Sequence, residues 1–181
     1  MRIDVKIPYG LNHKLAEEYN VCMEESVTNW VLLLDHDVFL SCNPYWYQIC
    51  LRAIEQVDDI TGMITCVCNP PNIKRRTQNP DIYDFSTDIE KHVQISKKLW
   101  EKHGIRLRRV NDYKIAGFFM LIRKSAWENV KFKEQGKVED KIDWKFVEGL
   151  IKKGYKIYEL PGLYVYHKRG VRKVNWEKGV L

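Results

Sequence analysis

The sequence predicts a single α/β domain with a mixed central sheet flanked by helices. Strand-like apolar runs alternate with helical patterns along all 181 residues, without a break in composition that would mark a second domain. The run WVLLL at residues 30–34 has no polar position, which is typical of a strand covered on both faces. Because 45% of the residues are hydrophobic, the chain can enclose an ordinary core, and we expect residues 1–181 to form one domain.

The first third of the chain is expected to run strand, helix, strand, helix. IDVKI, at residues 3–7, alternates apolar and charged residues and ends at a proline. A helical pattern follows at 12–26, with apolar positions at Leu15, Tyr19, Cys22 and Met23. After the strand 30–34, Asn43 and Pro44 match an N-cap followed by proline at the first helical position. The stripe of this second helix that should face the sheet comprises Ile49, Cys50, Ala53, Ile54 and Val57.

The remaining elements follow the same logic. Residues 69–84 contain three prolines and no periodicity, so we expect a long surface loop there. Gly104 and Gly154 stand where helices should end, and Pro161-Gly162 should form a turn between two strands. The expected strands are residues 63–68, 115–124, 155–160 and 163–167, and the expected helices are residues 87–103 and 139–154.

The charge predicts an acidic partner. A net charge of +6 and a pI near 9.0 would attract a nucleotide diphosphate, a nucleic acid or an anionic membrane face. Five cysteines without a CxxC pair, and no signal peptide, indicate reduced thiols in a cytoplasmic protein. No apolar stretch approaches the roughly 20 residues that span a bilayer, so we expect at most peripheral membrane contact.

Two carboxylates follow the apolar run directly. In an extended backbone the side chains of Asp35 and Asp37 share one face while His36 points away. The carboxyl end of a strand in an open α/β sheet is where ligands bind. Paired carboxylates repel each other unless a cation intervenes, and hard oxygen ligands suit Mg²⁺ or Mn²⁺. The alternative is an acidic turn in which both aspartates cap backbone amides.

A second acidic group opens the last helix. The helix dipole alone accounts for at least one of Glu139, Asp140 and Asp143, but a carboxylate near the metal could also take a proton from an attacking hydroxyl. His167 ends the last strand. It is either a partly buried histidine with a backbone partner or a nitrogen ligand to the metal.

Three segments in this order resemble the GT-A fold glycosyltransferases of the family 2-like group. GLNHKLAEEYNVCMEESVTNWVLLLDHDVFL is similar to the helix, here with Asn20, that leads into the metal-binding DxD motif. IAGFFMLIRKSAWENVKFKE is similar to the glycine-opened strand beside the acceptor site. VEDKIDWKFVEGLIKKGYKIYELPGLYVYH is similar to the ED motif, its helix, the following strand and a terminal histidine.

The resemblance implies a transferase that moves a sugar from a nucleotide-diphosphate donor to an acceptor hydroxyl of a glycan, protein or lipid, with inversion. Asp35 and Asp37 would hold Mn²⁺ or Mg²⁺ on the diphosphate, Asp37 as the direct ligand, and His167 would be a further ligand. Asp140, with Glu139 beside it, would be the general base.

Two further assignments follow from the same resemblance. Asn20 and Asp35 would contribute to donor binding, and Lys168 and Arg169, in a basic tail from about residue 168, would close over the phosphates; a solvated tail is the alternative. The nucleotide-binding part is shortened, because only about thirty residues precede the DxD segment. This brevity suggests a minimal member of the type found in viruses and phages, or a fragment of a longer enzyme.

Two other functions compete. VLLLDHDVFL also fits the signature of haloacid dehalogenase-like phosphatases, in which Asp35 would be a nucleophile and Asp37 a general acid. That reading gives His167 and Gly117 no role. The non-enzymatic alternative is a nucleic-acid binder that uses the basic clusters at 73–78 and 106–109. These are only charge clusters, so we expect no specific nucleic acid as a partner.

Overall fold

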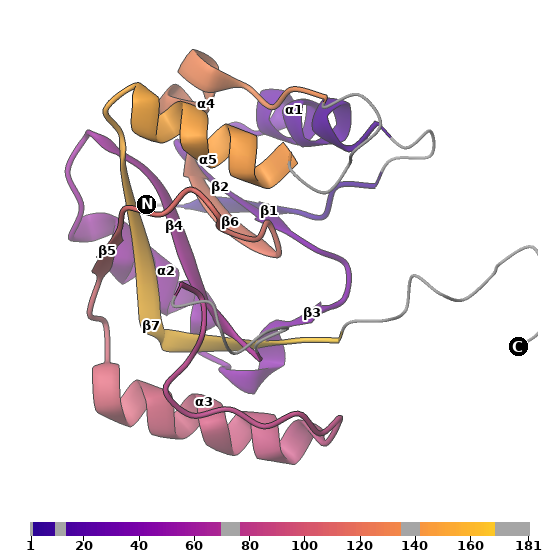
Figure 1. The fold of residues 1–181 in the computed structure, drawn as a ribbon, viewed down its shortest axis with the longest axis vertical. Coiled ribbons are helices and arrows are strands. Elements are labelled where there is room, and N and C mark those ends of the chain that lie inside the picture. Colours follow the sequence, from indigo (N-terminus) through magenta and orange to yellow (C-terminus); the bar gives the residue numbers. More distant parts are fainter. Residues whose placement is uncertain (1, 10–13, 70–76, 135–141, 169–181) are drawn as a thin grey trace, which may run out of the picture.

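The sheet is built around β2 (Trp30–Leu34), the apolar run of the sequence. The computed structural model describes residues 2–9, 14–69, 77–134 and 142–168 (Figure 1). The other strands in this part of the chain are β1 (Ile3–Lys6), β3 (Val38–Phe39), β4 (Thr61–Cys68), β5 (Arg108–Val110), β6 (Phe119–Arg123) and β7 (Lys156–His167). The helices are α1 (Leu15–Glu25), α2 (Trp46–Glu55), α3 (Ile89–His103), α4 (Lys124–Val130) and α5 (Ile142–Lys152), with a 3₁₀ turn η1 (Leu40–Cys42).

The strand order of the described sheet is β1-β2-β6-β4-β7-β3, and β5 also pairs with β7. β1 is parallel to β2 and β4 is parallel to β7, whereas β6 lies antiparallel between β2 and β4. β3 and β5 pair antiparallel with different halves of β7. The predicted fold class, an α/β fold with a mixed sheet flanked by helices, is therefore confirmed.

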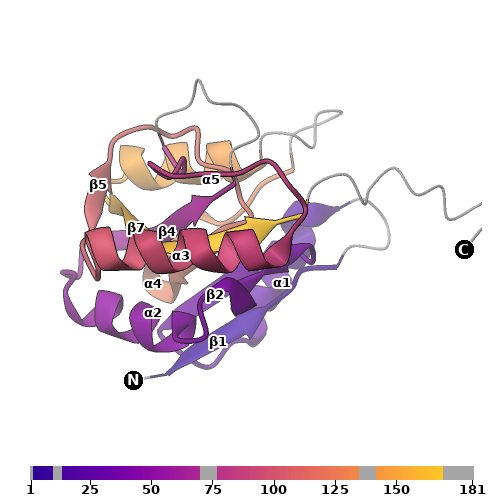
Figure 2. The ribbon, with the colours of Figure 1, turned by 90° about the horizontal axis from the view of Figure 1, so that it is seen from below.

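Helices cover both faces of the sheet, which explains the unbroken apolar run. Val31 and Leu33 pack in a cluster with α1, α4 and α5, while Trp30, Leu32 and Leu34 pack in a second cluster with α2. Figure 2 shows α2 and α5 on opposite sides of β4 and β7. A third, smaller cluster joins α3 to the last part of β7. The carboxyl end of β2 thus emerges from the interior at a fixed place.

Several boundaries differ from the sequence prediction. Asn43 does not cap α2, which begins at Trp46; instead its Oδ1 accepts a hydrogen bond from the Tyr45 amide, 3.0 Å away, in the preceding turn. β6 starts at Phe119 rather than at residue 115. β3, β5 and α4 were not predicted, because two, three and seven residues are too short to show a period.

β7 replaces the two strands that were expected around Pro161-Gly162. Leu160 and Tyr164 lie opposite the consecutive residues Cys66 and Val67 of β4, so the three residues between them form a bulge inside one strand. A Cβ added to Gly162 would lie 2.1 Å from the carbonyl oxygen of Gly104. Only glycine allows this approach of the bulge to the end of α3.

None of the helices in the described ranges has the length and apolar character needed to cross a bilayer.

Candidate metal centre

Asp35 and Asp37 leave the end of β2 in a tight turn. The Val38 amide donates to the Asp35 carbonyl oxygen, 3.3 Å away, and the Asp35 amide donates to the Phe118 carbonyl oxygen at 3.1 Å. His36, at the tip of the turn, is exposed. The sequence predicted an extended backbone at these residues, but the structure has a turn. The two carboxylates nevertheless converge, as predicted, because the turn brings them to one side.

His167 completes the cluster from the other end of the chain. Val38 pairs with His167 in the short β3–β7 ladder, and the Lys168 amide donates to the Asp37 carbonyl oxygen at 2.9 Å. His167 Nε2 lies 2.9 Å from Asp37 Oδ1 and 3.6 Å from Asp35 Oδ2. One ligand atom from each of the three side chains lies within 4.8 Å of the other two.

Neither the models of known protein families nor the curated protein sequences gave a match to this chain. The three side chains are 10 to 21% exposed, so an ion could reach them from solvent.

The donor set fits a divalent cation. Two carboxylates and an imidazole supply hard oxygen ligands and one nitrogen, a combination that suits Mn²⁺ and leaves positions for phosphate oxygens. A bound cation would also relieve the repulsion between the two carboxylates. Asp35, Asp37 and His167 are the residues of the described chain that such an ion would join.

The side chain of Asn69 holds the backbone of His167 in place. Its Oδ1 accepts from the His167 amide at 2.8 Å and its Nδ2 donates to the His167 carbonyl oxygen at 3.1 Å. The side chain thus takes the place of a neighbouring strand at the end of β7. Sequence reasoning missed Asn69; the available signal was an asparagine at the carboxyl end of a strand near the metal motif.

Asp143, in the first turn of α5, faces the same region. Its Oδ2 accepts from the Gly117 amide at 2.8 Å and its Oδ1 from the Trp144 amide at 2.8 Å. The pKa of the Asp143 carboxyl is raised from 3.8 to about 6, mainly because burial penalises the charged form. The negative charge of Asp35 acts in the same direction, which places Asp143 within electrostatic range of the metal cluster.

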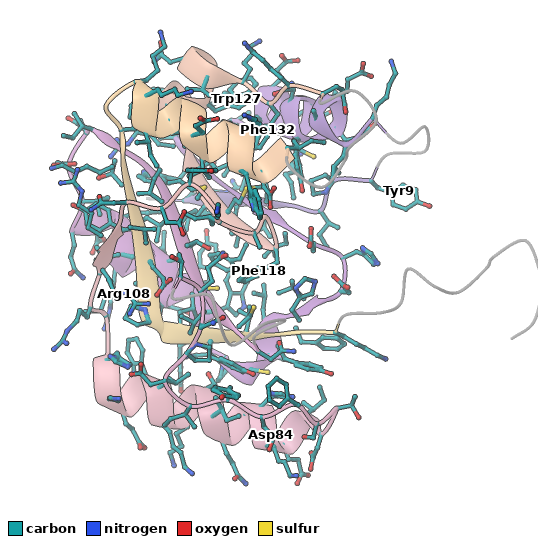
Figure 3. All side chains as sticks on the ribbon, viewed as in Figure 1. Tyr9, Asp84, Arg108, Phe118, Trp127 and Phe132 are labelled. Atoms are coloured by element: carbon teal, nitrogen blue, oxygen red, sulfur yellow. The ribbon has the colours of Figure 1, made fainter. Side chains whose placement is uncertain are left out.

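The turn before β6 joins these groups. Gly117 contacts Asp143 closely: a Cβ added to Gly117 would lie 3.2 Å from the Asp143 Cβ. The Phe118 ring, near the middle of Figure 3, lies 5.6 Å from the His167 ring. The two residues therefore connect Asp35, Asp143 and His167 through one short segment.

Gln78 holds this turn in place from the opposite side. Its side chain is buried, accepts from the Ala116 amide at 2.8 Å, and donates to the Ala116 carbonyl oxygen at 3.0 Å and to Thr65 Oγ1 at 2.9 Å. Its own amide donates to Glu159 at 2.6 Å. Its φ of 62° is unusual for a residue other than glycine, and strain of this kind is retained only where the surroundings fix it.

The other predicted site residues lie elsewhere or outside the described ranges. Asn20 links α1 to the segment after α4: its Oδ1 accepts from Trp127 Nε1 and the Phe132 amide, and its Nδ2 donates to the Phe132 carbonyl oxygen. Figure 3 labels Trp127 and Phe132 in that region. Lys168 is exposed next to the cluster. Three predicted site residues lie outside the described residues: Glu139, Asp140 and Arg169.

One residue of the basic cluster at 106–109 has a structural partner. Arg108, on β5 at the left of Figure 3, forms an ion pair with Glu159, a fully buried side chain. Arg108 neutralises this buried carboxylate, so the positive charge of Arg108 is not free to bind a nucleic acid. The other cluster lies mostly in the undescribed range 70–76.

Proposed function

We propose that this chain is a metal-dependent glycosyltransferase of the GT-A type, which moves a sugar from a nucleotide-diphosphate donor to an acceptor hydroxyl. The observation that carries the proposal is the Asp35–Asp37–His167 cluster with a third carboxyl, that of Asp143, in electrostatic range. A metal site beside a separate carboxyl with a raised pKa is the combination that such a transfer needs.

Asp35, Asp37 and His167 would hold Mn²⁺ or Mg²⁺. When bound, such an ion stabilises the negative charge that grows on the leaving diphosphate. The protein holds the three ligands through the β3–β7 ladder and the Asn69 side chain, so little reorganisation is needed at the moment of reaction. Lys168 and Arg169 would add positive charge for the phosphates.

Asp143 is the described carboxyl that suits a general base. With a pKa of about 6 it is ionised at neutral pH and is still a stronger base than an ordinary aspartate. Its two hydrogen bonds to backbone amides fix its orientation. This gives Asp143 the role that the sequence resemblance assigned to Asp140, whose own part stays a prediction.

The donor site is tested by thermal unfolding with nucleotide sugars, with and without Mn²⁺. A ligand that binds the folded state raises the melting temperature, and we expect this rise to require the metal. Asp37→Ala should remove it, whereas His36→Ala, the exposed neighbour in the same turn, should keep it. Equal stabilisation by a nucleotide sugar without Mn²⁺, or in Asp37→Ala, would refute the proposed metal role.

The base is tested by comparing Asp143→Asn with Asp140→Asn. If Asp143 takes the proton, its variant should bind donor and Mn²⁺ normally but transfer sugar at least about 100-fold more slowly. If only Asp140→Asn slows sugar transfer in this way, Asp140 rather than Asp143 is the general base.

A phosphatase would behave differently. A covalent adduct of a phosphate mimic on Asp35, found by mass spectrometry, would favour the haloacid dehalogenase-like alternative and exclude the transferase.

A further inference from the structure

A depression of about 200 Å³ lies between α2 and α3, away from the residues of the metal cluster. In the view of Figure 2, α2 lies below α3. The turn before α2 supplies two lining residues, α2 supplies three and α3 supplies one. The lining residues are Asn43, Tyr45, Gln48, Ile49, Arg52 and Trp100. The proposed transfer reaction uses none of them.

Two aromatic side chains form the apolar part of this depression. Tyr45 is 68% exposed, and Trp100 is half-buried against the α2 side of the core. Aromatic rings offer large flat faces at low cost in conformational entropy, so they are favoured where a ligand ring must be held. Ile49 is buried beneath them.

The polar groups of the depression are mostly donors without partners. Asn43 is only 7% exposed; its Oδ1 accepts from the Tyr45 amide, but none of the described residues accepts from its Nδ2. In the same part of the chain, no side chain pairs with the Trp100 ring N–H or the Arg52 guanidinium. The Asn43 amide therefore has a donor that can bond a ligand in the depression.

The charge of the depression is positive. Arg52 is cationic, and no acidic residue is among the lining residues. Gln48 and Arg52 stand one turn apart on α2 and therefore share a face. A ligand that suits this wall carries several oxygen acceptors and an anionic group, such as a carboxylate, for the guanidinium.

We propose that this depression binds one acidic sugar unit, a pyranose ring that carries a carboxylate. The C–H face of the ring packs on Tyr45 and Trp100. The amides of Asn43 and Gln48 bond its hydroxyls, since a side-chain amide carries both a donor and an acceptor. Arg52 pairs with the carboxylate. A neutral nucleobase would stack equally well but would leave Arg52 unpaired. The site does not depend on the metal cluster, so it is independent of the proposed function.

The test follows the indole N–H signal of Trp100 by ¹H–¹⁵N NMR, with Trp100→Phe to assign it. The probes are methyl β-D-glucuronide, methyl β-D-glucoside and uridine. We expect a saturable shift with the glucuronide, about tenfold weaker binding of the glucoside, and no binding of uridine. Arg52→Gln should reduce glucuronide binding to that of the glucoside, and Tyr45→Ala should remove both.

Two controls separate this site from the rest of the molecule. Tyr83→Ala changes another exposed tyrosine, and Asp37→Ala removes a metal ligand; both should leave glucuronide binding unchanged. Because Tyr45 is largely exposed, its replacement should not disturb the fold. The proposal is overturned if tens of millimolar glucuronide give no saturable shift, if Tyr45→Ala binds as the wild type does, or if uridine binds more tightly than the glucuronide.

Discussion

Burial in the folded protein disfavours the ionised form of Asp143, so the free energy of unfolding depends on pH. Between about pH 4 and pH 6 the folded state keeps the proton on Asp143, whereas the unfolded chain has already lost it. The folded state binds more protons in this window, so the contribution of Asp143 to the free energy of unfolding falls as pH rises.

The first prediction compares wild type and Asp143→Asn without metal. As pH rises from 4 to 6, the wild type should lose about 2 kcal/mol of stability relative to the variant, because only the wild type must ionise a buried carboxyl. Urea unfolding at several pH values in the presence of EDTA measures this difference. A difference that does not change with pH would mean that the carboxyl titrates normally.

The second prediction concerns Asn69. Replacing it with leucine leaves the amide and carbonyl of His167 without their side-chain partner and frees the end of β7. We expect Mn²⁺ affinity to fall about 10- to 100-fold, as is usual when the support of a metal ligand is lost. Titration calorimetry with Mn²⁺ measures it.

Asn129→Leu is the matched control. Asn129 also forms two side-chain hydrogen bonds, to the Ser125 carbonyl oxygen and Tyr155, but it lies on α4. Unchanged Mn²⁺ affinity in a folded Asn69→Leu protein would show that the ladder with β3 alone positions His167.

The sequence allowed the three members of the Asp35–Asp37–His167 cluster to be predicted but not the groups that support them. Asp35 and Asp37 stand out because they interrupt an apolar run, and His167 because it ends one. Asn69 and Gln78 act on backbone atoms of segments 98 and 38 residues away, and no local pattern records such a pairing. Their roles appear only when the strands are placed side by side.

At the scale of elements, length decided what could be predicted. β2 is an unbroken apolar run and the core positions of α2 recur at helical spacing, so both were predicted correctly. β3 has two residues and gains its conformation from β7, while α4 follows β6 directly, without a turn residue between them. Such short elements form because their neighbours supply hydrogen bonds, which local propensity does not reveal.

The third prediction tests the contact between the β7 bulge and the end of α3. A methyl group at Gly162 would overlap the Gly104 carbonyl, so Gly162→Ala should destabilise the protein by about 1–3 kcal/mol. Thermal unfolding measures the loss, and Ser125→Ala on the exposed side of α4 is the control. An unchanged melting temperature would mean that the bulge and α3 separate easily.

For the molecule as a whole, the cysteines report how closed the core is. Cys42, Cys50, Cys66 and Cys68 are buried and Cys22 is partly exposed. Burial raises the pKa of Cys50 to about 12 and raises that of Cys66 as well, so neither forms a reactive thiolate near neutral pH.

The fourth prediction follows for thiol labelling at pH 8. The native protein should react with a disulfide reagent at Cys22 at most, and all five thiols should react in guanidinium chloride. Cys22→Ser should abolish the native reaction. Rapid labelling of two or more thiols under native conditions would contradict the closed core.

The bulge in β7 also sets which face of the sheet the side chains of the last four residues of that strand take. Because successive strand residues face opposite ways, a one-residue slip of this half against β4 would turn His167 away from Asp35. The packing of Gly162 on Gly104 resists such a slip. An insertion or deletion between Leu160 and Tyr164 would therefore move the imidazole away from the two aspartates.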